Sequence, residues 1–279
     1  MLILLRSEQG SYYWHKSRNC GNRIAASDLA AVFCMHKHKS RNKLYQEKKK
    51  FRRREQNEDN PATFHGKFWE QFAVAKVIDT FFPEKEGWEY LTPGSILDPY
   101  YPISCSPDLI CQRGEEFIGI ETKCPYSAEI PKKKEDINSE YLLQCFCCLM
   151  VTGADRWVLS YYKSATDELT SYEIAPDSDL WSRVLMPPVS RFLSEVRDSS
   201  AATFSGPRKG RKEKKLESTI RERLMRLTSP LSHTPHEEND PYQKASEAEG
   251  SPELVGLLPS LHVERQLGHH AAGVAPRDV

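Results

Sequence analysis

The sequence predicts a mixed α/β domain followed by a polar tail. Three features predict it: a helical pattern over residues 62–82, a series of short β-type runs between residues 96 and 174, and an apolar helix over residues 139–151. Helices that precede, separate and follow strands are typical of a domain in which helices cover a sheet. The chain of 279 residues is long enough for one such domain with a sizeable core and an additional tail.

The first two helices are predicted from their caps and their apolar spacing. Ser27 is placed to cap the apolar segment DLAAVF at its N-terminus. In the 62–82 helix, the core-type aromatics Phe68 and Phe72 fall at helical spacing, and Pro83 closes the helix. Both helices are therefore expected to precede the strands.

The strands and the later helices follow from β-type composition and from helix-stopping residues. The β-type runs are residues 96–103, 109–111, 117–123, 157–162 and 169–174. The apolar helix over residues 139–151 lies between the third and fourth runs, and Gly153 ends it. A last helix is predicted over residues 179–196.

The chain changes character after Arg197. Small and polar residues dominate there, joined by the basic run PRKGRKEKK, and such a composition buries too little apolar surface to offset the entropy of ordering. We therefore predict an N-terminal segment over residues 1–10, a folded domain over residues 11–196, and a low-complexity, mostly disordered tail over residues 197–279. A short helix over residues 218–227 is compatible with this tail. The basic run fits a nuclear localisation signal, although such runs are also common in disordered tails.

The charge and cysteine content indicate where in the cell the protein is expected. Lys+Arg and Asp+Glu are equal at 39 each, so the overall charge points to no partner. Eight cysteines without regular spacing indicate reduced intracellular thiols rather than a secreted disulfide framework. No apolar run approaches the roughly 20 residues needed to span a bilayer. We expect an intracellular protein without membrane contact, nuclear in a eukaryotic cell or host and cytoplasmic otherwise.

An acidic and basic constellation in the middle of the chain indicates phosphodiester chemistry. Glu121 and Lys123 are two residues apart in a predicted strand, so their side chains share one face. Asp108 starts the preceding strand, and a turn containing Gly114 would lay the two strands side by side. Two carboxylates suit a hard divalent cation, and a lysine can orient a water or offset charge on the phosphate. Alone, this pattern also fits a solvated salt bridge at a strand edge.

Three further features extend the candidate site, and each has an ordinary alternative interpretation. Glu70, on the 62–82 helix, is a third carboxylate for the site or an exposed helix charge. Gln144 is a polar residue within an apolar helix, so it serves the site or is a satisfied core amide. Arg23 with Ser27 forms a phosphate grip near a helix start, or a surface cap.

Two other sets of residues each allow two interpretations. Two basic segments either follow the phosphate backbone of DNA or are solvated loops. They are the basic residues between 37 and 54 and the run PKKK at 131–134. Cys145, Cys147 and Cys148 invite a metal or iron–sulfur interpretation, but their spacing favours small apolar residues of a helix.

An ordered set of motifs resembles a known family. The set comprises RIAAS at 23–27, Gly66 and Glu70 on one helix, CSPD at 105–108, ETKCPYS at 121–127, Tyr141 with Gln144, and VTG at 151–153. In this order they resemble the YqaJ-type viral recombinases, the lambda-exonuclease branch of the PD-(D/E)XK nucleases. The resemblance implies a restriction-endonuclease-like core, in which helices flank a central mixed sheet.

The resemblance also implies a role for each matching residue. Asp108 and Glu121 would be the main metal ligands, with the carbonyl of Thr122, and Glu70 would serve a second metal or its water shell. Lys123 would position the attacking water. The phosphate would be bound by Ser106, Ser27, Gln144 and an arginine, for which Arg18 and Arg23 are both candidates. Two positions depart from the family pattern: Leu109 replaces a glycine, and Cys20 stands where an arginine is frequent.

The implied function is a Mg²⁺-dependent deoxyribonuclease with two ions per site, in which Mn²⁺ would substitute. The family digests one strand of linear double-stranded DNA, usually 5′ to 3′, in recombination or in viral or mobile-element genome processing. Its implied partners are a single-strand annealing protein and further copies in a homotrimer. Two alternatives stay open: an endonuclease or single-strand nuclease with the same site, and a non-catalytic DNA-binding scaffold that keeps the fold.

Overall fold

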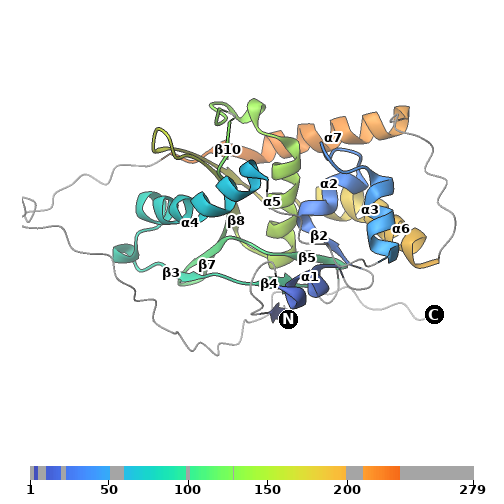
Figure 1. Ribbon diagram of the computed structural model, residues 1–279, viewed down its shortest axis with the longest axis horizontal. Coiled ribbons are helices and arrows are strands. Elements are labelled where there is room, and N and C mark those ends of the chain that lie inside the picture. Colours follow the sequence, from blue (N-terminus) through green and yellow to red (C-terminus); the bar gives the residue numbers. More distant parts are fainter. Residues whose placement is uncertain are drawn as a thin grey trace, which may run out of the picture. The chain divides into compact units, whose positions relative to one another are not determined.

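Two mixed β-sheets organise the part of the chain that the computed structural model describes, which is residues 3–5, 11–19, 23–50, 60–98, 101–127, 129–198 and 210–232. Within these ranges the larger sheet has, in spatial order, β10 (Thr228–Pro230), β9 (Glu168–Ile174), β8 (Arg156–Lys163), β7 (Glu116–Lys123), β6 (Leu109–Arg113) and β3 (Glu89–Leu91). The smaller sheet has β1 (Ile3–Leu5), β4 (Ser95–Leu97), β5 (Ile103–Cys105) and β2 (Ile24–Ala25). The predicted fold class, sheets flanked by helices, is confirmed (Figure 1).

The central strands are joined as the sequence indicates. β6 and β7 form an antiparallel hairpin with Leu109 opposite Ile120, and Gly114 adopts a positive φ of 59° in the turn between them. β7 and β8 are parallel, and the connection between them contains α5 (Ser139–Thr152). The hairpin and the crossover together set the C-terminal end of β7 beside the start of β6.

Helices α4 (Pro61–Phe81) and α5 cover opposite faces of the larger sheet (Figure 1). Val77 of α4 packs in one core cluster with Ile118 and Val158. The neighbouring strand residues Trp157 and Leu159 belong to the other core cluster, which α5 joins. Because side chains of a strand alternate between faces, the two helices bury alternate residues of the same strands.

Local chemistry explains where both helices begin and end. The side chain of Asn60 accepts the backbone N–H of Thr63 at 2.9 Å, and Pro61 occupies the first turn. Asn138 accepts the N–H of Glu140 at 3.0 Å at the start of α5. Gly153, with a φ of 69°, ends α5 as predicted.

The structure corrects the prediction for Ser27. The chain makes a 3-10 turn, η1 (Ala26–Asp28), before the four-residue helix α2 (Leu29–Val32), and neither start has a side-chain cap. Every residue of α2 is buried. Packing around the whole helix therefore fixes its start, in place of a serine cap.

The predicted strand over residues 96–103 is two strands, β4 and β5. Asp98 accepts the N–H of Tyr101 at 3.2 Å, and Pro102 has no N–H to donate to a ladder. The chain turns there, and β5 pairs back on β4 in antiparallel orientation.

The structure also corrects the prediction that the aromatic residues of α4 lie in the core. Phe68 and Phe72 are 47% and 44% exposed, whereas Ala73 and Val77 are the fully buried residues of the helix. Small and branched side chains let α4 approach the sheet, and the phenylalanines are left on its outer side.

The remaining helices lie around this core. α1 (Tyr12–Asn19) and α3 (Arg41–Lys50) come from the N-terminal third, and the short turns η2 (Glu84–Glu86) and η3 (Lys134–Asp136) lie in connections. The predicted last helix begins as a π-helix, η4 (Leu180–Leu185), and continues as α6 (Met186–Asp198). Among the described residues, no helix combines the length and apolarity needed to cross a membrane.

The chain after residue 196 contributes to the fold, contrary to the predicted domain boundary. Helix α7 (Arg211–Leu227) is longer than the short helix considered for the tail, and its Ile220 and Leu224 are fully buried in the core. β10 then extends the larger sheet beside β9. The compact unit that holds the described residues ends at Ser232. The predicted low-complexity character of residues 233–279 concerns segments outside the described residues.

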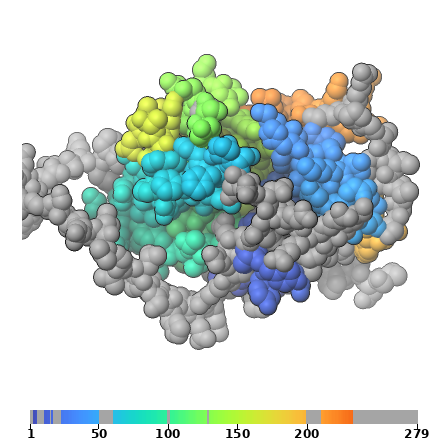
Figure 2. All heavy atoms as spheres, viewed as in Figure 1, coloured from blue at the N-terminus to red at the C-terminus, as the bar shows by residue number. Residues whose placement is uncertain are grey.

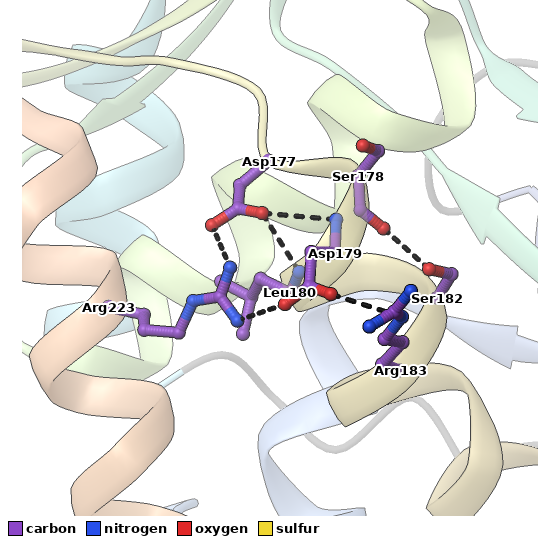
Figure 3. A network of polar contacts seen from close by, with 7 residues as sticks. All are labelled: Asp177, Ser178, Asp179, Leu180, Ser182, Arg183 and Arg223. Atoms are coloured by element: carbon purple, nitrogen blue, oxygen red, sulfur yellow. Dashed lines mark hydrogen bonds and ion pairs between the residues drawn. The ribbon is translucent and has the colours of Figure 1, made fainter.

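Polar contacts fix the C-terminal half of α7. Figure 3 shows Arg223 between two carboxylates: it donates to Asp177 and, at 2.6 Å, to Asp179. Lys134 Nζ donates to the carbonyls of Met225 and Thr228 at 3.1 and 3.2 Å, which satisfies the C-terminal end of the helix.

Truncating Leu224 to alanine is expected to destabilise the protein by about 2–5 kcal/mol, because it leaves a cavity beneath α7. The exposed neighbour Arg221 provides the control, and Arg221→Ala should change stability by less than about 0.5 kcal/mol. Urea denaturation measures both. Equal stabilities for the two variants would contradict the assignment of α7 to the core.

Candidate active site

Glu121 and Lys123 meet at the end of β7 as the strand period predicts. Lys123 Nζ lies 2.5 Å from Glu121 Oε1, and Gln144 Nε2 of α5 donates to the same oxygen at 2.6 Å. The Lys123 ammonium also lies 4.9 Å from the ring centre of Tyr141. Glu121, which is 4% exposed, is thus held between a strand neighbour and a helix.

Asp108 lies beside this pair, at the start of β6. Its Oδ2 accepts two hydrogen bonds from Thr122, one from the backbone N–H at 2.7 Å and one from the hydroxyl at 2.9 Å. The Asp108 N–H donates to the carbonyl of Ile120 at 3.2 Å. The hairpin therefore fixes the Asp108 carboxylate against the strand that carries Glu121 and Lys123.

Glu70 reaches the same site from α4. Burial raises the pKa of Glu70, and the charge of Glu121 raises it further, while Lys123 and Lys67 act in the opposite direction. The helix passes close to the strand end: a Cβ at Gly66 would lie 4.0 Å from the carbonyl oxygen of Cys124. The predicted third carboxylate is therefore within electrostatic range of the β7 residues.

Negative charge dominates the cluster. The pKa of Asp108 is raised well above its ordinary value, first by burial and then by Glu121 and Glu70. Burial lowers the pKa of Lys123, but Glu121 and Asp108 outweigh that effect and leave it raised. Lys123 is thus a stable cation that faces three carboxylates, and it cannot balance them all.

Oxygen chemistry and charge at this site fit a hard cation. Glu121 Oε2 is buried and has no hydrogen-bond partner within the described part of the chain. Buried polar atoms of native proteins normally have at least one such partner. The described residues contain no group of three or more His, Cys, Asp or Glu side chains that could hold a metal ion by themselves. Mg²⁺ commonly uses only one or two protein carboxylates and completes its shell with waters and phosphate oxygens, so the donors present suit it.

Ser106, a predicted phosphate-binding residue, stands two positions before Asp108 in the chain. Its hydroxyl oxygen accepts a hydrogen bond from Trp14 Nε1 at 3.0 Å, and the same N–H lies 2.9 Å from the carbonyl of Gly94. An accepted bond leaves the Ser106 hydroxyl proton able to donate elsewhere. Trp14 was missed from the sequence, because only the fold brings α1 to the loop before Asp108.

The remaining phosphate candidates come from the N-terminal part of the chain. Arg23 donates to the backbone carbonyl of Asp98 at 2.9 Å. Ser27 lies in η1, which packs against α5, the helix of Gln144. Arg18 belongs to α1, and its side chain lies outside the described residues, as does all of Cys20.

Several basic residues expected along DNA have partners within the protein. Lys39 binds Asp28 at 2.7 Å, and Arg41 binds Glu195 at 2.8 Å. Lys134, in the run at 131–134, holds the end of α7, while Lys132 and Lys133 are exposed. Residues 51–54, the last of the basic stretch, lie outside the described residues.

The cysteines of α5 are core residues, as their spacing indicated. Cys145, Cys147 and Cys148 are all buried and belong to the larger core cluster. Burial is the largest cause that raises the pKa of each thiol.

Replacing Gln144 by leucine is expected to lower the DNA hydrolysis that the sequence predicts by about 10- to 100-fold, because Glu121 loses a donor that holds its Oε1 in place. Gln144→Glu should lower it at least as much, because it adds a fourth carboxylate to the cluster. Initial rates on end-labelled duplex DNA measure both. Wild-type rates in the two variants would show that Gln144 has no part in the site.

Comparisons with known proteins agree with this fold. A family model described as the YqaJ-like viral recombinase domain matches residues 13–155, more than half of the chain and a range that contains every candidate site residue. No curated protein sequence matches significantly.

Among solved structures, the chain is similar to the alkaline exonuclease LHK-Exo of Laribacter hongkongensis, with 22% identity, a TM-score of 0.51, and coverage of 76% of this chain and 99% of that one. It is also similar to LHK-Exo in complex with dAMP, with 24% identity, a TM-score of 0.52, and coverage of 68% and 94%. These likenesses show a common fold. The chain belongs to the YqaJ-like viral recombinase domain family.

Proposed function

We propose that the protein is a metal-dependent nuclease that hydrolyses phosphodiester bonds of DNA. The observation that carries the proposal is the cluster of Glu70, Asp108 and Glu121 around the ammonium of Lys123, in which one buried oxygen of Glu121 has no hydrogen-bond partner among the described residues. Such a cluster is costly for a metal-free fold and suits a site built for a cation and a phosphate. Membership of the family and the fold shared with an alkaline exonuclease support the same activity.

In this proposal Asp108 and Glu121 would hold Mg²⁺, with Mn²⁺ as a substitute. The backbone carbonyl of Thr122 would be a further ligand, and Glu70 would serve a second ion or its water shell. A bound divalent cation polarises the scissile phosphate and makes a coordinated water a better nucleophile. The protein's own part is to hold these oxygens rigidly, which Thr122 does for Asp108 and Gln144 for Glu121.

In the same proposal Lys123 would act on the reacting groups. Its raised pKa keeps it charged across the physiological range, so it is a donor and never a base there. It can orient the attacking water and offset the charge that develops on the phosphate. The hydroxyl of Ser106, held by Trp14, would donate to a phosphate oxygen, together with Ser27, Gln144 and either Arg23 or Arg18.

The finer features of the proposal rest on the resemblance to the family. The substrate would be linear double-stranded DNA, digested 5′ to 3′ from an end. The activity would serve recombination or the processing of viral or mobile-element genomes. A single-strand annealing protein would take the exposed strand, and the nuclease would act as a homotrimer.

Linear and covalently closed circular DNA of the same sequence test the proposal. The purified protein should degrade end-labelled linear duplex in Mg²⁺, leave the circle intact, and lose activity in a chelator. A nicked or linearised circle would instead indicate an endonuclease with the same site. Binding of DNA without any hydrolysis in Mg²⁺ or Mn²⁺ would favour the non-catalytic scaffold. Linear substrates with a 5′-phosphate, a 5′-hydroxyl or a blocked 5′ end then measure the end preference.

A further inference from the structure

Three phenylalanines form an exposed row along the outer side of α4. Phe64, Phe68 and Phe72 are 63%, 47% and 44% exposed, and we call them the aromatic row. Their spacing of four residues places them one above another on the helix. The ring centres are 6.3 Å apart between the first pair and 5.8 Å between the second. Figure 2 shows α4, in cyan, on the surface of the molecule.

The fold of the described residues gives the aromatic row no structural task. α4 is anchored to the sheet through Ala73 and Val77, on its other side. Large apolar side chains that cluster on a surface mark a place where something binds. The row is therefore a candidate contact surface.

Ring contacts connect the aromatic row to the candidate active site. Phe68 contacts Trp69 with ring centres 5.2 Å apart, and Trp69 contacts His65 at 6.2 Å. His65 in turn contacts Tyr126 at 5.3 Å, and Tyr126 is 59% exposed and three residues beyond Lys123. Glu70 of the cluster lies on the same helix. A continuous aromatic surface therefore runs from the end of β7 along α4.

We propose that the aromatic row stacks against unpaired bases of a single-stranded DNA segment next to the active site. The proposal rests on the nuclease function proposed above. Every base has a π-face, so stacking on aromatic side chains binds a single strand regardless of its sequence. Lys67 is exposed on α4 between Phe64 and Phe68 and supplies a positive charge for the strand's phosphates. Continuity with a phosphodiester site and this charge favour a nucleic acid over a protein partner.

Two triple variants separate stacking from apolar burial. Changing Phe64, Phe68 and Phe72 all to leucine keeps a large apolar surface and a good helix former but removes the rings. Changing the three to tyrosine keeps the rings. Circular dichroism checks that each variant retains the fold.

The probe is a single-stranded oligonucleotide that contains 2-aminopurine, whose fluorescence falls when the base stacks. Binding is measured in a chelator, so that hydrolysis does not consume the probe. Wild type and the tyrosine variant should quench the probe and bind it with similar affinity. The leucine variant should lose the quenching and bind roughly 100-fold more weakly, because several stacking contacts are lost together.

Other outcomes distinguish failure of this inference from failure of the proposed function. Equal binding and quenching by the leucine variant, while wild type hydrolyses duplex in Mg²⁺, would overturn the stacking proposal and leave the nuclease in place. Ring-dependent quenching without hydrolysis of any DNA would sustain the stacking surface and overturn the nuclease. Self-association that Phe68→Glu disrupts, with no ring-dependent quenching, would assign the row to a second copy of the chain and reject stacking.

Discussion

Replacing Asp108 by asparagine is expected to stabilise the metal-free protein while abolishing DNA hydrolysis. Asp108 is penalised as an anion by burial and by the charges of Glu121 and Glu70. Asparagine removes the charge, and its amide oxygen can still accept both hydrogen bonds from Thr122. We expect a gain of about 0.5–2 kcal/mol, as is common when a strained active site is relieved, and a loss of activity of about 1,000-fold.

The pH dependence of stability follows from the same shift. The folded-state pKa of Asp108 lies above its ordinary value of 3.8, so between the two values the folded protein binds more protons than the unfolded chain. Stability of the metal-free wild type therefore falls as pH rises through that interval, and this fall should be smaller in Asp108→Asn. Chemical denaturation at several pH values, in a chelator, measures the effect.

Asp155 provides the matched control for Asp108. It also accepts a backbone N–H, from Phe117 at 2.8 Å, but it lies outside the carboxylate cluster. Asp155→Asn should give no gain in stability and should retain hydrolysis. An Asp108→Asn variant that is less stable than wild type without metal, or that still degrades DNA, would contradict the electrostatic account of the site.

Gly119→Ala is expected to destabilise the protein by about 3 kcal/mol or more, because the neighbouring strand leaves no room for a methyl group. Gly119 lies opposite Trp157 in the β7–β8 ladder. A Cβ at Gly119 would come within 2.1–2.4 Å of three atoms of the Trp157 ring, which is fully buried. The strand must move, and activity should fall as well because Glu121 is two residues away on the same face.

Gly66→Ala is the control, and it should have the opposite sign. The nearest atom to a Cβ there is 4.0 Å away, which is ordinary contact. Alanine in a helix interior is more stable than glycine by about 0.5–1 kcal/mol. Urea denaturation of both variants gives the comparison. A Gly119→Ala protein as stable as wild type would show that Trp157 does not pack as described.

The sequence was sufficient for the part of the site that depends on local periodicity. Glu121 and Lys123 share a face because side chains of a strand alternate with a period of two. Gly114 allows the turn that brings β7 back beside Asp108 at the start of β6. The helix that ends at Gly153 was also predictable, since only a residue tolerant of positive φ fits there.

Long-range packing accounts for what the sequence left out. Periodicity shows that Phe68 and Phe72 share a side of α4, but it does not say which side faces the sheet. Likewise, nothing local brings Trp14 to Ser106, 92 residues away. The sequence of α7 does contain an indication of a buried helix face, because Ile220 and Leu224 are four residues apart. The many charged residues around them nevertheless give the segment the composition of a disordered tail.

Hydrolysis of end-labelled linear duplex by Lys123→Met tests the central claim most directly. Methionine is close to lysine in length and retains contact with Tyr141 without the charge. The control is Lys163→Met, which removes a lysine from the end of β8 that pairs with Glu129 at 2.6 Å. In Mg²⁺, Lys123→Met should be slower than wild type by at least about 100-fold, and Lys163→Met should differ by less than about twofold. Wild-type hydrolysis by Lys123→Met would contradict the account.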